Sequence, residues 1–264
     1  MKPKVAVVLP AYNLEETIAS SLGRIEAGIE NWSSEYDFEV FVIDDGSEDG
    51  TYQAAQEWSE EHPLGINLDK NPENLGLAET LRRAYQRVLE SDPDFILKTD
   101  LDADYDQRKT FDKLLSVPEK PHVITLVGDR NFPREQNPYD FDMREDMLRI
   151  LGEEPDLGRL EPDLGRLDPS TIGSQLYQAA YVRHMLKQEI TMNHRKRWGM
   201  DLIMSLFAFV KNGFDAMMVD VDMGEYDPTR RPKEKVRAQY DAQIEIIGVL
   251  VGKSPQELSL MYGK

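Results

Sequence analysis

Short apolar runs alternate with longer stretches of helical periodicity along this chain, and this alternation constrains the fold more than any other feature. A first buried strand is predicted at Val5–Leu9, and Pro10 ends it because proline cannot donate to a strand ladder. The other predicted strands are Phe38–Ile43, Phe95–Leu97, Val123–Val127 and Ala216–Val221. The pattern predicts an α/β fold with a mostly parallel sheet of at least five strands, flanked by helices on both faces.

Helices are predicted between these strands. In Leu14–Glu30 the apolar side chains recur at helical spacing, and Asn13 precedes them as a candidate cap. Glu15 and Glu16 would then lie in the first turn, where negative charge is favourable. The other predicted helices are Thr51–Glu61, Ala78–Leu89 and Leu202–Val210.

The 264 residues can bury one sizeable core, so we expect one domain over residues 1–230 and a C-terminal helical extension over 231–264. The heptapeptide EPDLGRL occurs twice in tandem, at residues 154–160 and 161–167. Two copies cannot form a solenoid, and the prolines and glycines indicate a turn-rich inserted loop over about residues 131–172. A lid over the site is the alternative function of this insertion.

The formal net charge of −18 argues against a nucleic-acid partner, because a phosphate backbone would be repelled. No cysteine is present, which excludes thiol catalysis and thiolate metal sites. No run approaches the roughly 18 apolar residues of a membrane span, and the first residues do not resemble a signal sequence. We therefore expect a cytoplasmic protein; peripheral contact with the inner face of the membrane and a homodimer are left open.

The stretch KTDLDADYDQ, residues 98–107, concentrates carboxylates directly after a predicted strand. If the chain stays extended there, alternate aspartates point to the same side; these are Asp100, Asp102, Asp104 and Asp106. Such a group favours a hard divalent cation, magnesium or manganese, which also accepts diphosphate oxygens. A solvated acidic loop is the alternative interpretation.

Two further polar loops follow predicted strands, LPAYN at residues 9–13 and IDDGSEDGT at residues 43–51. Ligands of open α/β sheets bind beyond the carboxyl ends of the strands, so these loops and the acidic stretch should line one crevice. Tyr12 offers a stacking face for a base, and Asp45 can accept hydrogen bonds from a base or a ribose. The alternative for the second loop is a turn in which Ser47 or Asp49 caps the next helix.

PAYN, VIDDGSEDGT, NPENLGLAETLRRAY at residues 71–85 and DLDAD resemble, in order and spacing, glycosyltransferase family 2, including its polyprenyl-phosphate mannosyl- and glucosyltransferases. The resemblance is strongest over residues 1–110. It implies a Rossmann-like GT-A fold with a nucleotide-sugar-binding half over 1–110 and an acceptor half over 111–230. It also implies a soluble enzyme that transfers a sugar from a UDP- or GDP-sugar with the help of a divalent metal ion.

The resemblance assigns roles to individual residues. The implied nucleotide-sugar contacts are Pro10, Ala11, Tyr12, Asn13, Asp44, Asp45, Gly46, Asp102 and Ala103. The implied metal ligands are Asp102, Asp104 and Asp106. The implied catalytic residues are Asp201 as general base, Asp104 at the metal, and Arg130, whose GDRN segment is similar to a family element that faces phosphate. An aspartate in the first turn of a helix is the ordinary alternative for Asp201.

Two basic clusters interrupt the acidic sequence, and both are candidate phosphate contacts. Their proposed phosphate or acceptor contacts are Arg195, Arg230, Arg231 and Lys235. A solvated helix end or loop is the alternative for each. A phosphate-bearing acceptor fits these cations: either a polyprenyl phosphate, as in the inverting relatives, or a small phosphorylated metabolite, as in retaining glucosyl-3-phosphoglycerate synthases. The family resemblance implies inversion, and a late histidine of the retaining enzymes has no counterpart after Asp201.

Three other classes of protein can share an α/β fold that binds a nucleotide. A dinucleotide oxidoreductase or a sugar nucleotidyltransferase would carry a glycine-rich loop after the first strand, where this chain has PAYN. A non-catalytic nucleotide-sugar binding module would share the donor site. Unlike a transferase, it would show no slow hydrolysis of the donor. The sequence leaves this last alternative open.

Overall fold

The computed structural model describes residues 1–101, 106–129, 173–194, 198–210, 213–222, 233–254 and 256–257. Its strands are β1 (Lys4–Ala11), β2 (Asp37–Asp44), β3 (Ile66–Lys70), β4 (Phe95–Lys98), β5 (Val123–Asp129), β6 (Gln175–Gln178) and β7 (Ala216–Asp222). Its helices are α1 (Ile18–Trp32), α2 (Thr51–Glu61), α3 (Leu77–Val88), α4 (Gln107–Leu115), α7 (Ala179–Met185), α8 (Glu189–Asn193), α9 (Met200–Val210) and α10 (Lys233–Leu250), with a 3-10 turn η1 (Leu89–Ser91).

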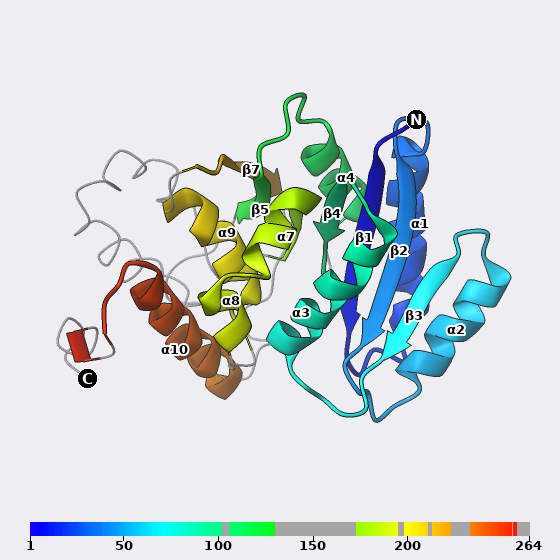
Figure 1. Ribbon diagram of the computed structural model, residues 1–264. Coiled ribbons are helices and arrows are strands. Elements are labelled where there is room, and N and C mark those ends of the chain that lie inside the picture. Colours follow the sequence, from blue (N-terminus) through cyan, green and yellow to red (C-terminus); the bar gives the residue numbers. More distant parts are fainter. Residues whose placement is uncertain are drawn as a thin grey trace.

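The strands form one sheet in the order β3-β2-β1-β4-β6-β5-β7 (Figure 1). All pairings are parallel except those of β6, which runs antiparallel to both of its neighbours. The predicted mostly parallel α/β sheet is therefore confirmed. Because β1, β2 and β4 are parallel neighbours, the loops that follow them emerge at the same edge of the sheet.

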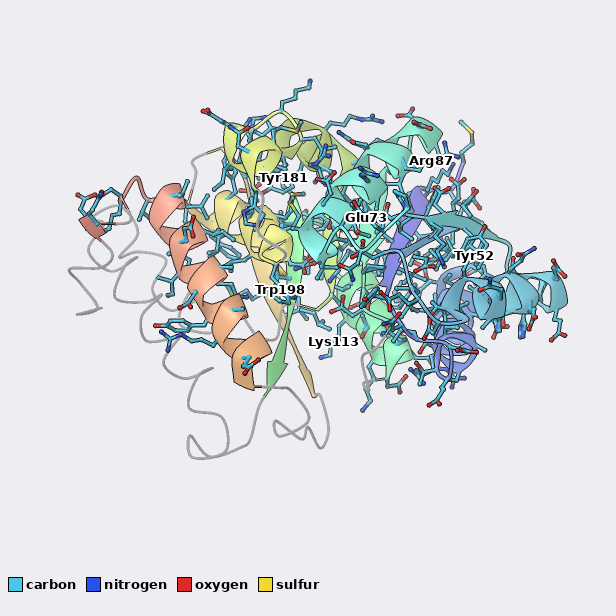
Figure 2. All side chains as sticks on the ribbon, turned by 90° about the horizontal axis from the view of Figure 1, so that it is seen from below. Tyr52, Glu73, Arg87, Lys113, Tyr181 and Trp198 are labelled. Carbon is cyan, nitrogen blue, oxygen red and sulfur yellow. The ribbon has the colours of Figure 1, made fainter. Side chains whose placement is uncertain are left out.

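Two apolar layers cover the two faces of the sheet. One face packs against α3, α7, α9 and α10, and the other packs against α1, α2 and α4. Alternation along the strands explains this: Ile96 of β4 lies in the first layer and Leu97 in the second. Figure 2 shows these layers from below, with α4, which carries Lys113, and α7, which carries Tyr181, on opposite sides.

Several elements differ from the sequence prediction. Strands β3 and β6 and helix α4 were not predicted. Three of the five residues of β3 are exposed, and β6 has only four residues. The predicted cap at Asn13 is wrong: Asn13 adopts a positive φ of 52°, Leu14 begins a turn, and α1 starts only at Ile18. Glu15 and Glu16 therefore precede the helix.

The last long helix belongs to the same core. The α10 residues Ile244, Ile247 and Leu250 are buried in the same core cluster as α9. Ile246 of α10 lies close to Gly199, since a Cβ at Gly199 would be 2.1 Å from Ile246 Cδ1. Figure 1 shows α10 beside α9 at the end of the molecule away from β3. The division at residues 230 and 231 stays a prediction. Among the described helices, none combines the length and the apolar character that crossing a bilayer requires.

Candidate active site

The loops after β1 and β2, which the sequence predicts at the same edge of the sheet, are joined by hydrogen bonds. Asp45 N donates to Ala11 O (2.8 Å), Asn13 N donates to Ser47 Oγ (2.9 Å), and the Asn13 side chain accepts from Glu48 N (3.1 Å). Tyr12, between these anchored residues, keeps 41% of its surface exposed. The ring is therefore free to stack on a flat ligand while its backbone is held.

Asp44 ends β2 with a buried carboxylate that is only partly satisfied. Its Oδ1 accepts hydrogen bonds from Ser47 N (2.8 Å) and Ser47 Oγ (2.5 Å). Its Oδ2 lies 3.3 Å from Lys70 Nζ but makes no hydrogen bond among the described residues. A buried acceptor without a hydrogen bond costs free energy, so this oxygen is suited to an N–H or O–H group of a ligand.

Asp45 is engaged within the protein. Its Oδ1 accepts from Asn71 Nδ2 (3.0 Å), Leu75 N (2.9 Å) and Thr80 Oγ1 (2.6 Å), and its Oδ2 accepts from Gly76 N (2.9 Å). The side chain is 5% exposed. This carboxylate fixes the segment that leads into α3 against the end of β2, and it has little capacity left for a nucleotide.

Gly46 allows the same segment to approach. Its φ is +69°, and a Cβ built there would lie 2.2 Å from the backbone carbon of Glu73. Both the positive φ and the lack of space require glycine. Gly46 therefore admits the backbone of residues 73–74, and its predicted contact with the nucleotide sugar stays a prediction.

The acidic stretch after β4 does not continue as a strand. The ladder ends at Lys98, Leu101 lies in a turn, and Asp106 caps α4 by accepting from Arg108 N (3.0 Å). The strand does not continue over residues 99–101, and the alternation of aspartates from 100 to 106 stays a prediction. Leu101, before the undescribed residues, is nevertheless held against α1, because Ser21 Oγ donates to Leu101 O (2.7 Å). Asp102, Ala103 and Asp104 lie outside the described residues.

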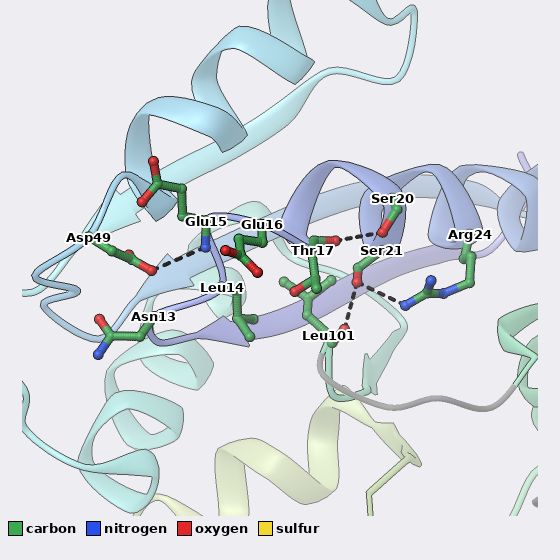
Figure 3. Close-up of a pocket in the computed structure, with 10 residues that line it drawn as sticks. All are labelled: Asn13, Leu14, Glu15, Glu16, Thr17, Ser20, Ser21, Arg24, Asp49 and Leu101. Carbon is green, nitrogen blue, oxygen red and sulfur yellow. Dashed lines mark hydrogen bonds between the residues drawn. The ribbon is translucent and has the colours of Figure 1, made fainter. Parts of the chain in front are cut away.

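A pocket of about 500 Å³ lies where these three loops approach α1. Asn13 of the first loop, Asp49 of the second and Leu101 of the third contribute to its wall (Figure 3). The remaining lining residues are Leu14, Glu15, Glu16, Thr17, Ser20, Ser21 and Arg24. The predicted convergence of the three loops is thus present, although this pocket lies on the α1 side rather than between Tyr12 and Asp44.

A buried ion cluster lies at the end of β4 on the opposite face of the sheet. Lys98 Nζ donates to Asp100 Oδ1 (2.6 Å), to Gly173 O (3.2 Å) and to Asp201 Oδ2 (3.2 Å). Asp201, in the first turn of α9, is predominantly buried, and its Oδ1 has no hydrogen-bond partner among the described residues. Lys98 was not singled out in the sequence, although a lysine closing the apolar run FILK is a signal that could have marked it.

Burial and charge oppose each other in this cluster. Burial raises the pKa of Asp201 above that of an ordinary aspartate, and the nearby Lys98 ammonium only partly offsets this. Burial alone would lower the pKa of Lys98, but the carboxylates of Asp100 and Asp201 outweigh it and raise that pKa, so the ammonium stays charged. Asp201 is thus a carboxylate of increased basicity held by a permanent cation.

The other predicted site residues fall into two groups. Pro10 and Ala11 end β1 at the ligand edge, and Ala11 is buried. Arg130, Arg195, Arg230 and Arg231 lie outside the described residues, and Lys235 lies in α10 with a side chain outside them. Among the described residues, no group of three histidines or carboxylates that could hold a metal ion comes together. The roles predicted for Pro10, Ala11, Lys235 and the four arginines therefore remain predictions.

Solved structures share this fold. Glucosyl-3-phosphoglycerate synthase from Mycobacterium tuberculosis, solved with Mn²⁺, UDP and phosphoglyceric acid, matches with a TM-score of 0.65 and 17% identity over 96% of this chain and 80% of that one. Mannosyltransferase PcManGT from Pyrobaculum calidifontis, solved with GDP-Man and Mn²⁺, matches with a TM-score of 0.55 and 16% identity over 100% and 80%. The expected GT-A type of α/β fold is confirmed.

Sequence comparison agrees. A dolichol-phosphate mannosyltransferase of Pyrococcus furiosus is 28% identical over 85 residues, which are 32% of this chain and 22% of that protein. The matches to curated relatives span 22% to 42% of the relatives' own length. The pattern of the family described as Glycosyl transferase family 2 matches residues 6–170, more than half of the chain. The chain therefore belongs to glycosyl transferase family 2.

Proposed function

We propose that this protein is a metal-dependent glycosyltransferase that moves a sugar from a UDP- or GDP-sugar to a phosphate-bearing acceptor, with inversion. The observation that carries the proposal is the convergence of the loops after β1, β2 and β4 on one pocket at the edge of the sheet. Family membership supports the activity class. Relatives and structural neighbours whose names include nucleotides, Mn²⁺ and phosphorylated acceptors support the ligand classes.

The nucleotide occupies the crevice after β1 and β2 in this proposal. Tyr12 stacks on the base, and Asp44 Oδ2 accepts from an N–H of the base or an O–H of the ribose. Pro10, Ala11 and Asn13 shape the first loop. Asp45 and Gly46 act indirectly, since they hold the segment before α3 against the end of β2.

A divalent cation suits the residues that follow. Asp102 and Asp104 offer hard carboxylate oxygens, and the residues that flank them are anchored: Leu101 O accepts from Ser21 Oγ, and Asp106 caps α4. Asp106 Oδ1 accepts a hydrogen bond from Arg108 N at the start of α4, so we expect Asp106 to be the weakest of the three proposed metal ligands. The bound ion would stabilise the negative charge that develops on the departing nucleoside diphosphate.

The chain's own groups would complete the reaction. Arg130, Arg230 and Arg231 are proposed to face the phosphates, and Arg195 and Lys235 the acceptor. Asp201 is proposed as the general base, because its raised pKa favours taking a proton from an acceptor hydroxyl. An acceptor phosphate is already ionised and needs no strong base, so the dependence of the rate on Asp201 differs between acceptor types.

A second candidate is a retaining synthase with a small phosphorylated acceptor. It is favoured by the likeness to glucosyl-3-phosphoglycerate synthase, which extends over 96% of this chain. The absence of a histidine after Asp201 counts against it, because the resemblance implies a late histidine in the retaining metal site. The two candidates differ in acceptor and in the configuration of the product, so one assay separates them.

The first experiment is a thermal-shift panel of UDP-, GDP- and other nucleotide sugars with and without Mn²⁺. A ligand that binds only the folded state raises the melting temperature, so we expect one base to give a manganese-dependent rise. The selected donor is then incubated with a short-chain polyprenyl phosphate or with 3-phosphoglycerate, and the anomeric configuration of the product is determined by NMR. A stable donor complex with neither transfer nor donor hydrolysis would instead indicate a binding module.

Calorimetry with the nucleoside diphosphate, with and without Mn²⁺, tests whether Asp104 is a metal ligand. Asp104→Ala should abolish the manganese-dependent part of the affinity, and Asp112→Ala, a carboxylate on α4 outside the acidic loop, should leave it intact. Unchanged affinity in Asp104→Ala would refute the assignment of Asp104.

A further inference from the structure

Lys98 is a buried ammonium in a layer that is otherwise largely apolar. It is fully buried on β4 and lies on the same face as Ile96, which packs in the core against α3 and α9. Lysine is almost never fully buried unless it is paired, because desolvation of the charge is costly. Buried ion pairs are often no more stable than apolar residues of similar volume. Stability alone therefore gives little reason for a lysine here.

The ammonium is saturated. Its three N–H groups match three acceptors at 2.6 to 3.2 Å, Asp100 Oδ1, Gly173 O and Asp201 Oδ2. With no donor or lone pair left over, and a pKa held high by two carboxylates, Lys98 cannot serve as a nucleophile or a base. Its chemistry is limited to holding these three groups.

The three acceptors belong to separate segments of the chain. Asp100 precedes the acidic loop, Gly173 lies two residues before β6, and Asp201 lies in the first turn of α9. Gly173 and Asp201 are 75 and 103 residues away from Lys98 in sequence. One side chain thus connects the proposed metal loop to the proposed base.

Asp201 has few other constraints on its carboxylate. Oδ2 contacts Lys98, and Oδ1 has no hydrogen-bond partner among the described residues. The hydroxyls of Tyr85 on α3 and Tyr177 on β6 are buried, and neither makes a hydrogen bond among the described residues. The charge of Asp201 adds to burial in raising the pKa of both phenols. Without Lys98, these hydroxyls are alternative donors toward which the carboxylate can turn.

We propose that Lys98 is a positioning residue for transfer: it fixes the Asp201 carboxylate relative to the acidic loop through the triad of Asp100, Lys98 and Asp201. This proposal deepens the proposed function and rests on it. A base that is misplaced by about 1 Å can lose roughly 100-fold in rate although the bound ligands are unchanged. The expected signature is a loss of kcat with donor affinity retained.

The test compares Lys98→Met with Leu97→Ala in the full chain. Leu97 is the adjacent buried residue of β4 but faces the opposite layer, so its truncation destabilises the sheet without touching the triad. We expect Lys98→Met to lower kcat by about 100-fold and to leave the dissociation constant of the nucleoside diphosphate with Mn²⁺ unchanged. Leu97→Ala should keep kcat close to that of the wild type when rates are normalised to folded protein.

Two further variants address charge and folding. Lys98→Arg keeps the positive charge and should recover part of the kcat that Lys98→Met loses, which a purely apolar packing role would not predict. If Lys98→Met does not fold, Lys98→Gln replaces it; its amide still donates to a carboxylate, and the same loss of kcat with retained donor affinity is expected.

Hydrogen exchange provides a readout that does not need activity. Amides of residues 173–178 and 199–203 should exchange faster in Lys98→Met than in Leu97→Ala, because both segments lose their anchor. The proposal is overturned if kcat in Lys98→Met equals that of the wild type, if donor affinity falls as much as kcat, or if exchange in both segments is unchanged. If the wild-type protein transfers no sugar, the proposed function fails, and the exchange data still decide whether Lys98 holds the two segments.

Discussion

The carboxylates at the end of β2 and those beside the end of β4 are held by different chemistry. Asp44 and Asp45 receive hydrogen bonds from backbone amides, hydroxyls and a side-chain amide, all within 35 residues along the chain. Asp201 is held by a buried ammonium 103 residues away. The donor edge is therefore preorganised mainly by neutral donors, together with the Lys70 ammonium 3.3 Å from Asp44 Oδ2, whereas the opposite side depends on one ionic contact between residues 103 apart.

The largest expected effect is a loss of kcat on the β4 side, when the Asp201 carboxylate is replaced. Asp201→Asn keeps the size of the side chain but removes the base, so kcat with a hydroxyl acceptor should fall by about 10² to 10⁴. Donor affinity, measured by calorimetry, should stay constant because the nucleotide contacts lie on the loops after β1 and β2. If the acceptor reacts through its phosphate, the fall in kcat will be small, and Asp201 is then not a base.

The next effect is on stability at the β2 end. Asp45→Ala leaves four donors without their acceptor, two of them backbone N–H groups of the segment before α3. Since an unsatisfied buried group costs about 1–3 kcal/mol, we expect a loss of about 3 kcal/mol in the free energy of unfolding measured with urea. Glu48→Ala, an exposed neighbour, should change it by less than about 0.5 kcal/mol. Equal stability of the two variants would contradict the structural role of Asp45.

Asp44→Asn sharpens the contrast between the paired aspartates. The amide oxygen can still accept from Ser47 N, but the acceptor proposed for the nucleotide is replaced by a donor. Nucleoside diphosphate affinity should fall about tenfold, which is about 1.4 kcal/mol. Asp45→Asn is the matched control. A greater loss of affinity in the control, at equal stability, would return the nucleotide contact to Asp45.

The smallest effect is a displacement of the pH profile. The pKa of Asp201 is raised by burial, so the acidic limb of kcat should lie above the range of an ordinary aspartate near 3.8. In Lys98→Met the limb should move further up, because the ammonium lowers that pKa. The raised pKa also makes stability depend on pH. The contribution of Asp201 to the free energy of unfolding is fully present below pH 3.8 and declines as the pH rises through the raised pKa. Tyr85 and Tyr177 also interact electrostatically with Asp201, and Asp100 shares the Lys98 ammonium with it. Profiles of kcat against pH for the wild type and for Lys98→Met test whether the acidic limb lies higher in the variant.

Sequence periodicity predicted the elements that bury a continuous apolar stripe, such as β1, β2 and α2. It missed β3, whose side chains are largely solvent-exposed, and β6, whose four residues are too few for a recognisable pattern. At the site, the motifs identified the right loops. They did not distinguish Asp44 from Asp45, because that difference depends on where residues 71–80 fold back. Lys98 and Asp201 meet only in the tertiary structure.

The position of β6 orders the assembly of the sheet during synthesis. Strands β1 to β4 pair among themselves within the first 98 residues, so this part can form as it leaves the ribosome. β5, in contrast, has no neighbour until β6 has been translated, and β6 itself adds to the already formed edge at β4. Vectorial folding would thus complete the donor edge early and leave an open strand edge waiting for residues 175–178.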